Sequence, residues 1–104
     1  MSTSSEEAMY LDTIAEVTFT QLVTASGLPE GELVELVRYG ALIPRDPHAA
    51  AWTFEARSLA VAKKASRLRH DFELDAHSVS VVLRYLERIA ELEEEIRALR
   101  ARAG

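Results

Sequence analysis

The chain has 104 residues, a length that suits one small domain with a modest hydrophobic core. Its hydrophobic share of 48% and charged share of 28% are ordinary for a globular protein, and its formal net charge of −5 argues against general affinity for nucleic acid. Because it has no cysteine, disulfides, thiolate metal sites and cysteine nucleophiles are excluded. No apolar run approaches the ~20 residues of a membrane helix and no secretory leader is visible, so we expect a cytoplasmic protein.

The first segment, residues 1–15, begins with a run of serine, threonine and glutamate. We expect it to form a flexible acidic tail, because it combines carboxylates with few residues that could form a core. The domain then begins at residue 16. Val17-Thr18-Phe19 combines β-branched and aromatic residues and predicts a short strand.

Two helices follow at the spacing of a helix-turn-helix. Thr20 suits the N-cap of a first helix that ends at Ser26, and Gly27 supplies the left-handed position after its end. Proline suits the first turn of a second helix over about 29–39, and Gly40 ends it. Apolar residues of this second helix recur at the spacing of a buried face, namely Leu33, Leu36 and Val37.

A small β-ribbon, the wing, is predicted after the second helix. Ile43 and Pro44 begin an extended segment, residues 45–51 form the loop, and residues 52–54 close the ribbon. Trp52 and Phe54 are two residues apart and therefore lie on the same side of a strand. We expect at least one of them to pack as core, whereas an exposed Trp52 would be a candidate binding hot spot.

A third helix is predicted from about Ala56 to Phe72. One side of it is apolar, formed by Leu59, Ala62, Ala65, Leu68 and Phe72. The basic residues lie largely elsewhere on this helix and would form a solvated flank: Lys63, Lys64, Arg67 and Arg69. Residues 16–74 are therefore expected to form one winged helix-turn-helix unit.

The last segment, residues 75–104, is predicted to be a long helix with Asp75 as its N-cap. Its apolar residues alternate at spacings of three and four, the pattern of heptad positions a and d. They are Val82, Tyr85, Ile89, Leu92, Ile96 and Leu99. We expect this helix to form a homodimer through a coiled coil, although the run covers fewer than three full heptads and leaves a parallel or antiparallel pairing open.

These residues resemble two nested families. The frame from Phe19 through Leu28 and Tyr39 to Arg45 is similar to the DNA-binding half of MerR-type regulators. Three segments resemble more closely the chaperone-modulator (CbpM-type) family: residues 27–33, Trp52-Thr53-Phe54-Glu55, and the Arg-Leu-Arg-His run over 67–75. The resemblance implies a mainly α, MerR-like winged helix-turn-helix with a small β-wing and a long C-terminal dimerisation helix.

The family resemblance also implies a function. Its members bind a DnaJ-type co-chaperone, the curved-DNA-binding protein, and inhibit it. An acidic modulator that docks on the basic helix of the J-domain would compete there with the Hsp70 partner, DnaK, and would affect the co-chaperone's DNA binding only indirectly. Charge complementarity would raise the association rate and specificity, while apolar anchors would supply the affinity.

The second helix is acidic where a DNA-reading helix needs cations. This helix has a single arginine, Arg38, and three glutamates, Glu30, Glu32 and Glu35. The phosphates of a duplex, spaced one charge per ~1.7 Å, would repel the glutamates. We therefore expect these four residues and Trp52 to bind the J-domain. The other interpretation of the glutamates is a solvated helix face.

The Arg-Leu-Arg-His segment has two interpretations. Arg67, Arg69, His70, Asp71 and Asp75 either contact a partner or form a structural hydrogen-bond network between the third and fourth helices. We treat them as a structural signature.

No metal spacing, phosphate loop or catalytic triad can be argued from the sequence, so we expect no cofactor, no metal and no enzymatic activity. The second candidate function is a dimeric MerR-like transcription regulator that binds operator DNA, and the third is a bare oligomerisation module. Direct binding of nucleic acid is not expected.

Overall fold

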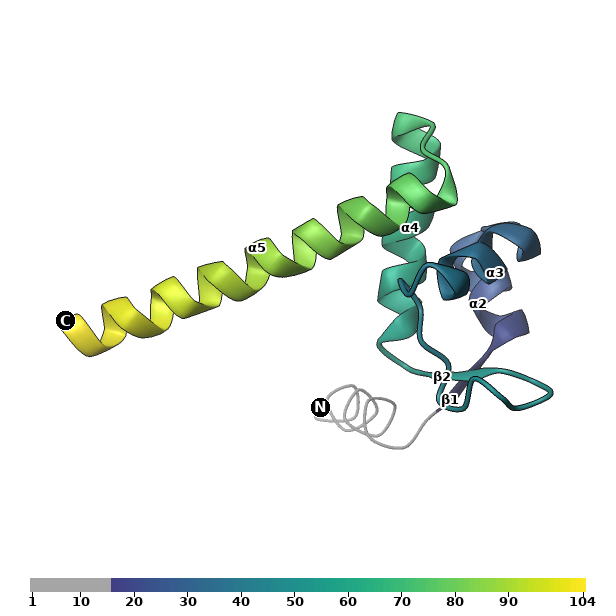
Figure 1. The fold of residues 1–104 in the computed structure, drawn as a ribbon, viewed down its shortest axis with the longest axis horizontal. Helices are drawn as coiled ribbons and strands as arrows, with labels where there is room; N and C mark the ends of the chain where they lie inside the picture. The colour runs from purple at the N-terminus through teal and green to yellow at the C-terminus, as the bar shows by residue number, and fades with distance from the viewer. Residues whose placement is uncertain (1–15) are drawn as a thin grey trace, which may run out of the picture.

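The computed structural model describes residues 16–104 and has four helices and two strands over that range. In chain order they are β1 (Glu16–Thr18), α2 (Phe19–Ser26), α3 (Glu30–Arg38), β2 (Thr53–Glu55), α4 (Ser58–Phe72) and α5 (Ala76–Ala103) (Figure 1). The mainly helical fold is confirmed. The predicted tail over 1–15 lies outside the described residues.

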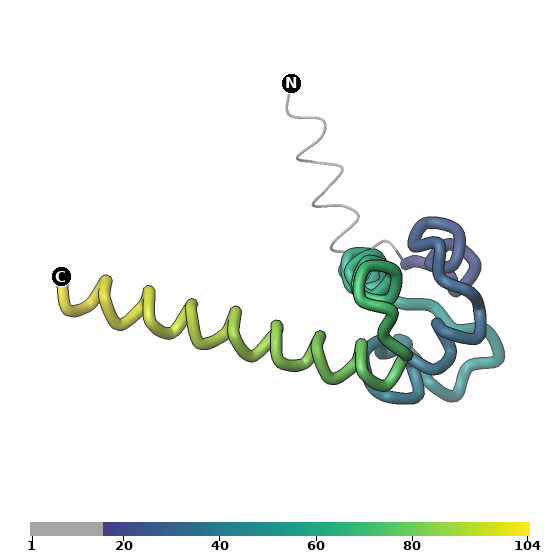
Figure 2. Tube along the Cα trace, turned by 90° about the horizontal axis from the view of Figure 1, so that it is seen from above, coloured from purple at the N-terminus to yellow at the C-terminus, as the bar shows by residue number. Residues whose placement is uncertain are grey.

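The molecule has two parts of unlike character, which we call the head (residues 16–83) and the arm (residues 84–104). In the head, α2, α3, α4 and the first turns of α5 pack around one core (Figure 1). The fully buried large side chains of that core are Phe54, Leu22, Leu33, Leu36, Leu42 and Val79. The arm leaves the head as a straight extension of α5 and contributes no buried residue (Figure 2).

The helix α2 begins two residues earlier than the predicted N-cap implies. The cap is Thr18, not Thr20, and Phe19 is helical rather than the last residue of a strand. Thr18 Oγ1 accepts from the Gln21 N–H at 3.0 Å, and Gln21 Oε1 accepts from the Thr18 N–H at 2.8 Å. This capping box needs Glu or Gln three residues after the cap. Thr18 has Gln21 at that position, whereas Thr20 has Val23, so the earlier threonine forms the cap.

The predicted pairing of the wing is wrong. Within residues 16–104 the only two-stranded sheet joins β2 to β1, antiparallel, with Val17 opposite Phe54. The extended segment at 43–45 contributes one backbone bond, from the Arg45 N–H to the Thr53 carbonyl at 2.8 Å. The prediction closed the ribbon between residues 43–44 and 52–54, whereas pairing with β1 lets Phe54 enter the core fully buried.

Two glycines set the turns that bracket α3. Gly27 has φ 77° after α2, and Gly40 has φ 81° after α3. Both angles lie in the left-handed region, where a side chain would be strained. At the second turn, Tyr39 stacks on His77 with ring centroids 4.9 Å apart, so the end of α3 contacts the start of α5.

The connection from α4 to α5 sets the direction of the arm. Glu73 ends α4 in the left-handed region with φ 54°, and Asp75 then caps α5 as predicted, its Oδ1 accepting from the Ser78 N–H at 2.8 Å. This backbone hydrogen bond is the main cause, and a hydrogen bond from the Ser78 side chain the second, of a pKa of Asp75 below its ordinary value. One expectation for α4 is wrong: Phe72 is 67% exposed and does not join the apolar side of the helix.

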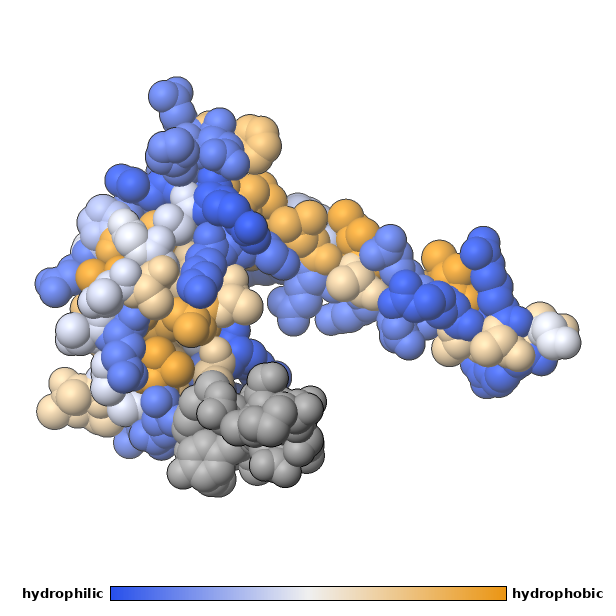
Figure 3. Space-filling model, turned by 180° about the vertical axis from the view of Figure 1, so that it is seen from behind, coloured by the Kyte–Doolittle hydropathy of each residue, from blue (hydrophilic) through white to orange (hydrophobic). Residues whose placement is uncertain are grey.

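The helix α5 has 28 residues and is therefore about 42 Å long, at about 1.5 Å per residue. Only its first turns pack on the head, through a core-facing side that includes Ala76, Val79 and Leu83. The predicted heptad residues lie on the remaining surface. Figure 3 shows apolar side chains recurring along the arm between charged ones.

Candidate protein-binding surface

The three glutamates of α3 do not form one open acidic face. Glu30, in the first turn, is exposed, and no ion pair to it occurs within residues 16–104. Glu32 is only 25% exposed at its side chain and lies 3.6 Å from Nε of Arg69 on α4. Glu35 lies 3.7 Å from Arg38 on its own helix. The expectation that all three carboxylates are presented to solvent is therefore wrong for Glu32, which faces α4.

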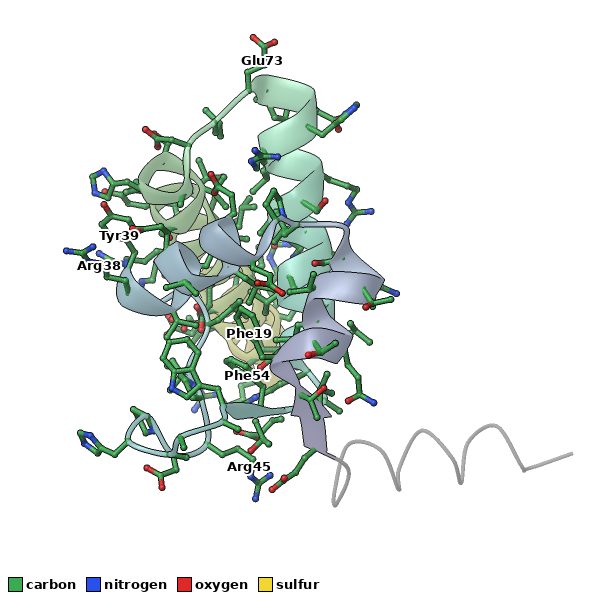
Figure 4. All side chains as sticks on the ribbon, turned by 90° about the vertical axis from the view of Figure 1, so that its right-hand side faces the viewer. Phe19, Arg38, Tyr39, Arg45, Phe54 and Glu73 are labelled. Carbon is green, nitrogen blue, oxygen red and sulfur yellow. The ribbon has the colours of Figure 1, made fainter. Side chains whose placement is uncertain are left out.

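Each arginine on the α3 and wing side of the head lies against a carboxylate. Besides the Arg38 pair, Arg45 contacts Glu16 at 3.0 Å and Arg57 contacts Glu55 at 3.1 Å. Figure 4 shows Arg38 and Arg45 at the margin of the head rather than inside it. Such exposed pairs add little stability, but each one cancels a cation that a phosphate backbone would require.

Trp52 is held rigidly beside the core. Its Nε1–H donates to the Pro47 carbonyl at 3.2 Å, which closes the loop before β2. Its ring meets Phe19 edge-on at 6.2 Å and Phe54 edge-on at 6.4 Å. The expectation that at least one of Trp52 and Phe54 packs as core is confirmed by Phe54. Trp52 itself is half-buried, so part of its ring remains available at the surface.

A hollow of about 520 Å³ lies between α3, the start of α2 and the loop before β2. Most of its lining is apolar, and one wall is Val34, which is 42% exposed on α3. The residues that line it are Thr18, Phe19, Thr20, Val34, Ala50, Ala51, Trp52 and Thr53. Val34 is not among the binding residues predicted from the sequence. The run of small residues before Trp52 was the available signal, since alanines leave space beside a large ring.

Within residues 16–104 the side chains of Arg69, His70 and Asp71 do not link α4 to α5. Arg69 contacts Glu32 of α3, and His70 Nδ1 lies 3.2 Å from Oδ1 of its neighbour Asp71, both exposed. Over residues 16–104 no side-chain hydrogen bond links Arg69, His70 or Asp71 to α5. Arg67 is exposed, while Asp75 acts as a helix cap. The proposed network between the third and fourth helices is therefore wrong, and the contact that exists fixes α3 on α4.

The heptad residues of α5 form a second candidate surface. Tyr85 is 65% exposed and Leu99 is 58% exposed, values that are high for large apolar side chains. The remaining members are Val82, Ile89, Leu92 and Ile96, which are half-buried or exposed. We call these six residues the arm seam, which runs from Val82 at the end of the head to Leu99 in the arm.

In the part of the chain that the structure describes, no three His, Asp or Glu side chains gather where they could hold a metal ion. No helix there is long and apolar enough to span a bilayer.

Comparison with known proteins agrees with this geometry. Residues 17–101 match the family described as MerR HTH family regulatory protein. Chaperone modulatory protein CbpM of Escherichia coli O139:H28 is 36% identical over 85 residues, which cover 82% of this chain and 84% of that protein. The protein of the same name from Shigella boydii serotype 18 matches with the same identity and coverage.

The chain belongs to the CbpM family of MerR-like proteins. The resemblance found in the sequence is thereby confirmed, and the match covers both the head and most of the arm. The arrangement of α2, α3 and the β1–β2 sheet is thus a MerR-like winged helix-turn-helix whose reading helix, α3, has a mixed apolar and acidic surface.

Proposed function

We propose that this protein is a binding modulator of a DnaJ-type co-chaperone, which it inhibits by docking on the J-domain in competition with DnaK. The name of its relatives, chaperone modulatory protein, supports a chaperone-modulating role. The structural observation that carries the proposal is the surface between α3 and the wing. It offers apolar side chains and the carboxylate of Glu30, which has no ion-pair partner within residues 16–104, and its arginines already contact carboxylates.

This charge arrangement favours a basic protein over a duplex. Entry of α3 into a major groove would bring phosphates toward Glu30 and would compete with three internal ion pairs for the arginines. A basic helix would instead find Glu30 available at the first turn of α3. Rim charges of this kind raise the association rate, and the apolar area supplies most of the affinity.

We also propose that the arm seam forms a homodimer with antiparallel helices. In one register the seam is self-complementary about a two-fold axis: Val82 meets Leu99, Tyr85 meets Ile96, and Ile89 meets Leu92. The same register brings Arg88 of one chain near Glu95 of the other, an attractive pairing. Arg88 contacts Glu91 within its own helix at 3.0 Å, and such an exposed pair can exchange at little cost.

The direct test is calorimetric titration of the full chain with the J-domain of a DnaJ-type co-chaperone. We expect saturable binding that added DnaK weakens. Glu30→Lys should weaken binding, while Glu87→Lys, an equal charge change on the exposed side of α5, should not. Glu30 is the better position to test, because replacing Glu32 would also leave Arg69 without its carboxylate.

Two outcomes would contradict the proposal. One is the absence of J-domain binding by the folded chain. The other is tight binding of the purified chain to duplex DNA that falls steeply with salt, which would support the transcription-regulator function instead.

A further inference from the structure

The hollow beside Trp52 has the properties of a preformed receptor for one side chain. Three separate segments build it: the start of α2, the middle of α3 and the loop before β2. Its floor is rigid, because Phe19 and Phe54 both contact the Trp52 ring and Phe54 is fully buried. A partner that docks here would find the aromatic ring already in place, so little conformational entropy would be lost on binding.

The loop that carries the hollow is fixed by its own hydrogen bonds. The Trp52 Nε1–H donates to the Pro47 carbonyl, and Asp46 Oδ1 accepts from the His48 N–H at 3.0 Å. Arg45 then ties the loop to β2 through its bond to Thr53. Ala50 and Ala51, which are exposed, complete the rim without filling the space.

The lining argues for an apolar side chain rather than a polar small molecule. Small-molecule sites are mostly apolar but contain a few polar groups that fix the ligand's orientation. Here the polar lining consists of threonines, and Thr18 Oγ1 is already engaged in capping α2. No buried side-chain nitrogen or oxygen within residues 16–104 lacks a hydrogen-bond partner. The site therefore lacks a polar group waiting for a ligand.

The charges on α3 near the hollow indicate which kind of partner residue would lie next to the apolar side chain that enters the hollow. Glu30 lies one helical turn before Val34, so the two residues share one face of α3. Glu30 is exposed and makes no ion pair within the described part of the chain, whereas Arg38, one turn after Val34, is paired with Glu35. Among residues 16–104, the unpaired charge on this face of α3 is therefore negative.

We infer that this hollow receives one large apolar side chain, leucine or aromatic, from a basic helix of the protein partner, with a lysine or arginine of that helix placed against Glu30. This inference rests on the proposed function and specifies the contact through which it operates. It assigns the affinity to Val34, Trp52 and the alanine rim, and it assigns to Glu30 only the orientation and the association rate.

The experiment uses the full chain and, as the probe, the J-domain of a DnaJ-type co-chaperone. Val34→Gln places a neutral polar side chain at the wall of the hollow and should weaken binding about tenfold or more. Ala51→Gln fills the rim of the hollow from the loop and should weaken binding to the same extent. Because it leaves α3 unchanged, it still tests the hollow if Val34→Gln disturbs that helix. Ile43→Gln is the matched control, because Ile43 is 71% exposed and does not line the hollow.

A second readout reports on the hollow directly. Trp52 is the only tryptophan in the chain, so 5-fluorotryptophan labelling gives a single ¹⁹F resonance at this site. That resonance should shift when the J-domain is added and should return when DnaK displaces it.

The outcomes separate this inference from the proposed function. Wild-type binding with an unmoved ¹⁹F resonance, and with both glutamine variants binding as tightly as the control, would overturn the hollow as the docking site and leave the modulator function standing. Absence of wild-type binding would overturn the function and this inference together. Weakened J-domain binding by Val34→Gln and Ala51→Gln, with unchanged binding by Ile43→Gln, would support both the proposed function and this inference.

Discussion

The head and the arm use the same kinds of residue to opposite effect. Leu33 and Leu36 in α3 are buried almost completely, whereas Leu92 and Leu99 in α5 are 40% and 58% exposed. Both sets recur at helical spacing, so periodicity alone does not distinguish them. The difference lies in the neighbours: α3 packs against α5, whereas α5 beyond residue 83 packs against no other element within residues 16–104.

This contrast shows that the buried core lies in the head and not in the arm. The head buries an aromatic ring and several leucines and has the contacts of an independent domain. An isolated helix with an apolar stripe in water is marginally stable, because most helical stability in proteins comes from packing of that stripe. The arm therefore depends on a second molecule more than the head does, and the following changes measure that dependence.

The largest expected effect comes from truncating the core of the head. Phe54→Ala removes a fully buried ring and should lower the free energy of unfolding by about 3–5 kcal/mol. Leu92→Ala in the arm should change the stability of the head by less than about 1 kcal/mol, since Leu92 is exposed in one chain. Urea denaturation followed by Trp52 fluorescence measures both. Equal losses for the two variants would contradict the division into head and arm.

The next effect concerns the arm seam. Ile89→Asp places two carboxylates near the proposed two-fold axis, and we expect it to abolish the dimer because a buried unpaired charge is costly. Sedimentation equilibrium at micromolar concentration should give the mass of two chains for the wild type and of one chain for the variant. Glu94→Gln, at an outward position of the same helix, is the control. A wild-type mass of one chain would contradict the dimer.

A smaller effect is expected at the first helix. Thr18→Ala removes the side-chain half of the capping box on α2 and should cost about 1 kcal/mol, measured by thermal denaturation. Thr20→Ala provides the matched control, because Thr20 is exposed and lies inside the helix rather than at its cap. If Thr20→Ala cost more than Thr18→Ala, the observed start of α2 would be wrong.

The smallest effect is a pH dependence at the junction between head and arm. Because the hydrogen bonds from Ser78 lower the pKa of Asp75 in the folded state, its carboxylate stabilises the fold above the unfolded pKa, about 3.9. This contribution is lost as the pH falls through the lower, folded pKa. Asp75→Asn retains a capping oxygen without a titrating charge.

The melting temperature of Asp75→Asn should therefore fall less than that of the wild type between neutral pH and pH about 3, by a few degrees at most. Asp71→Asn provides the comparison, because the wild-type carboxylate is exposed and lies 3.2 Å from His70 Nδ1. Identical acid sensitivity of wild type and Asp75→Asn would show that the cap contributes nothing through its charge.

Sequence reasoning located the elements governed by local rules. The buried face of α3, the left-handed glycine after α2 and the Asp75 cap each depend on residues a few positions apart, and all three are present. It failed where distant segments compete. The partner of β2 is β1, and the opposed residues Val17 and Phe54 are about 37 positions apart in the sequence. No local pattern specifies a pairing over that separation.

The candidate surface shows the same limit. The acidic character of α3 was visible in the sequence, but the direction of each carboxylate was not, since Glu32 faces Arg69 from another helix. The hollow required three segments to meet, and its rim of alanines has no chemical signature of its own. Its tryptophan was identified as a candidate, although the rings that immobilise it come from α2 and β2.

The length of α5 has a geometric consequence for the proposed pair. With the helices antiparallel, each head lies at the opposite end of the shared rod, so two docking surfaces are held apart by a rigid spacer. Each added heptad would lengthen that spacer by about 10 Å without altering either surface. The number of residues in α5 thus sets the distance between the two docking surfaces. That distance determines whether one partner with two binding segments can occupy both surfaces at once.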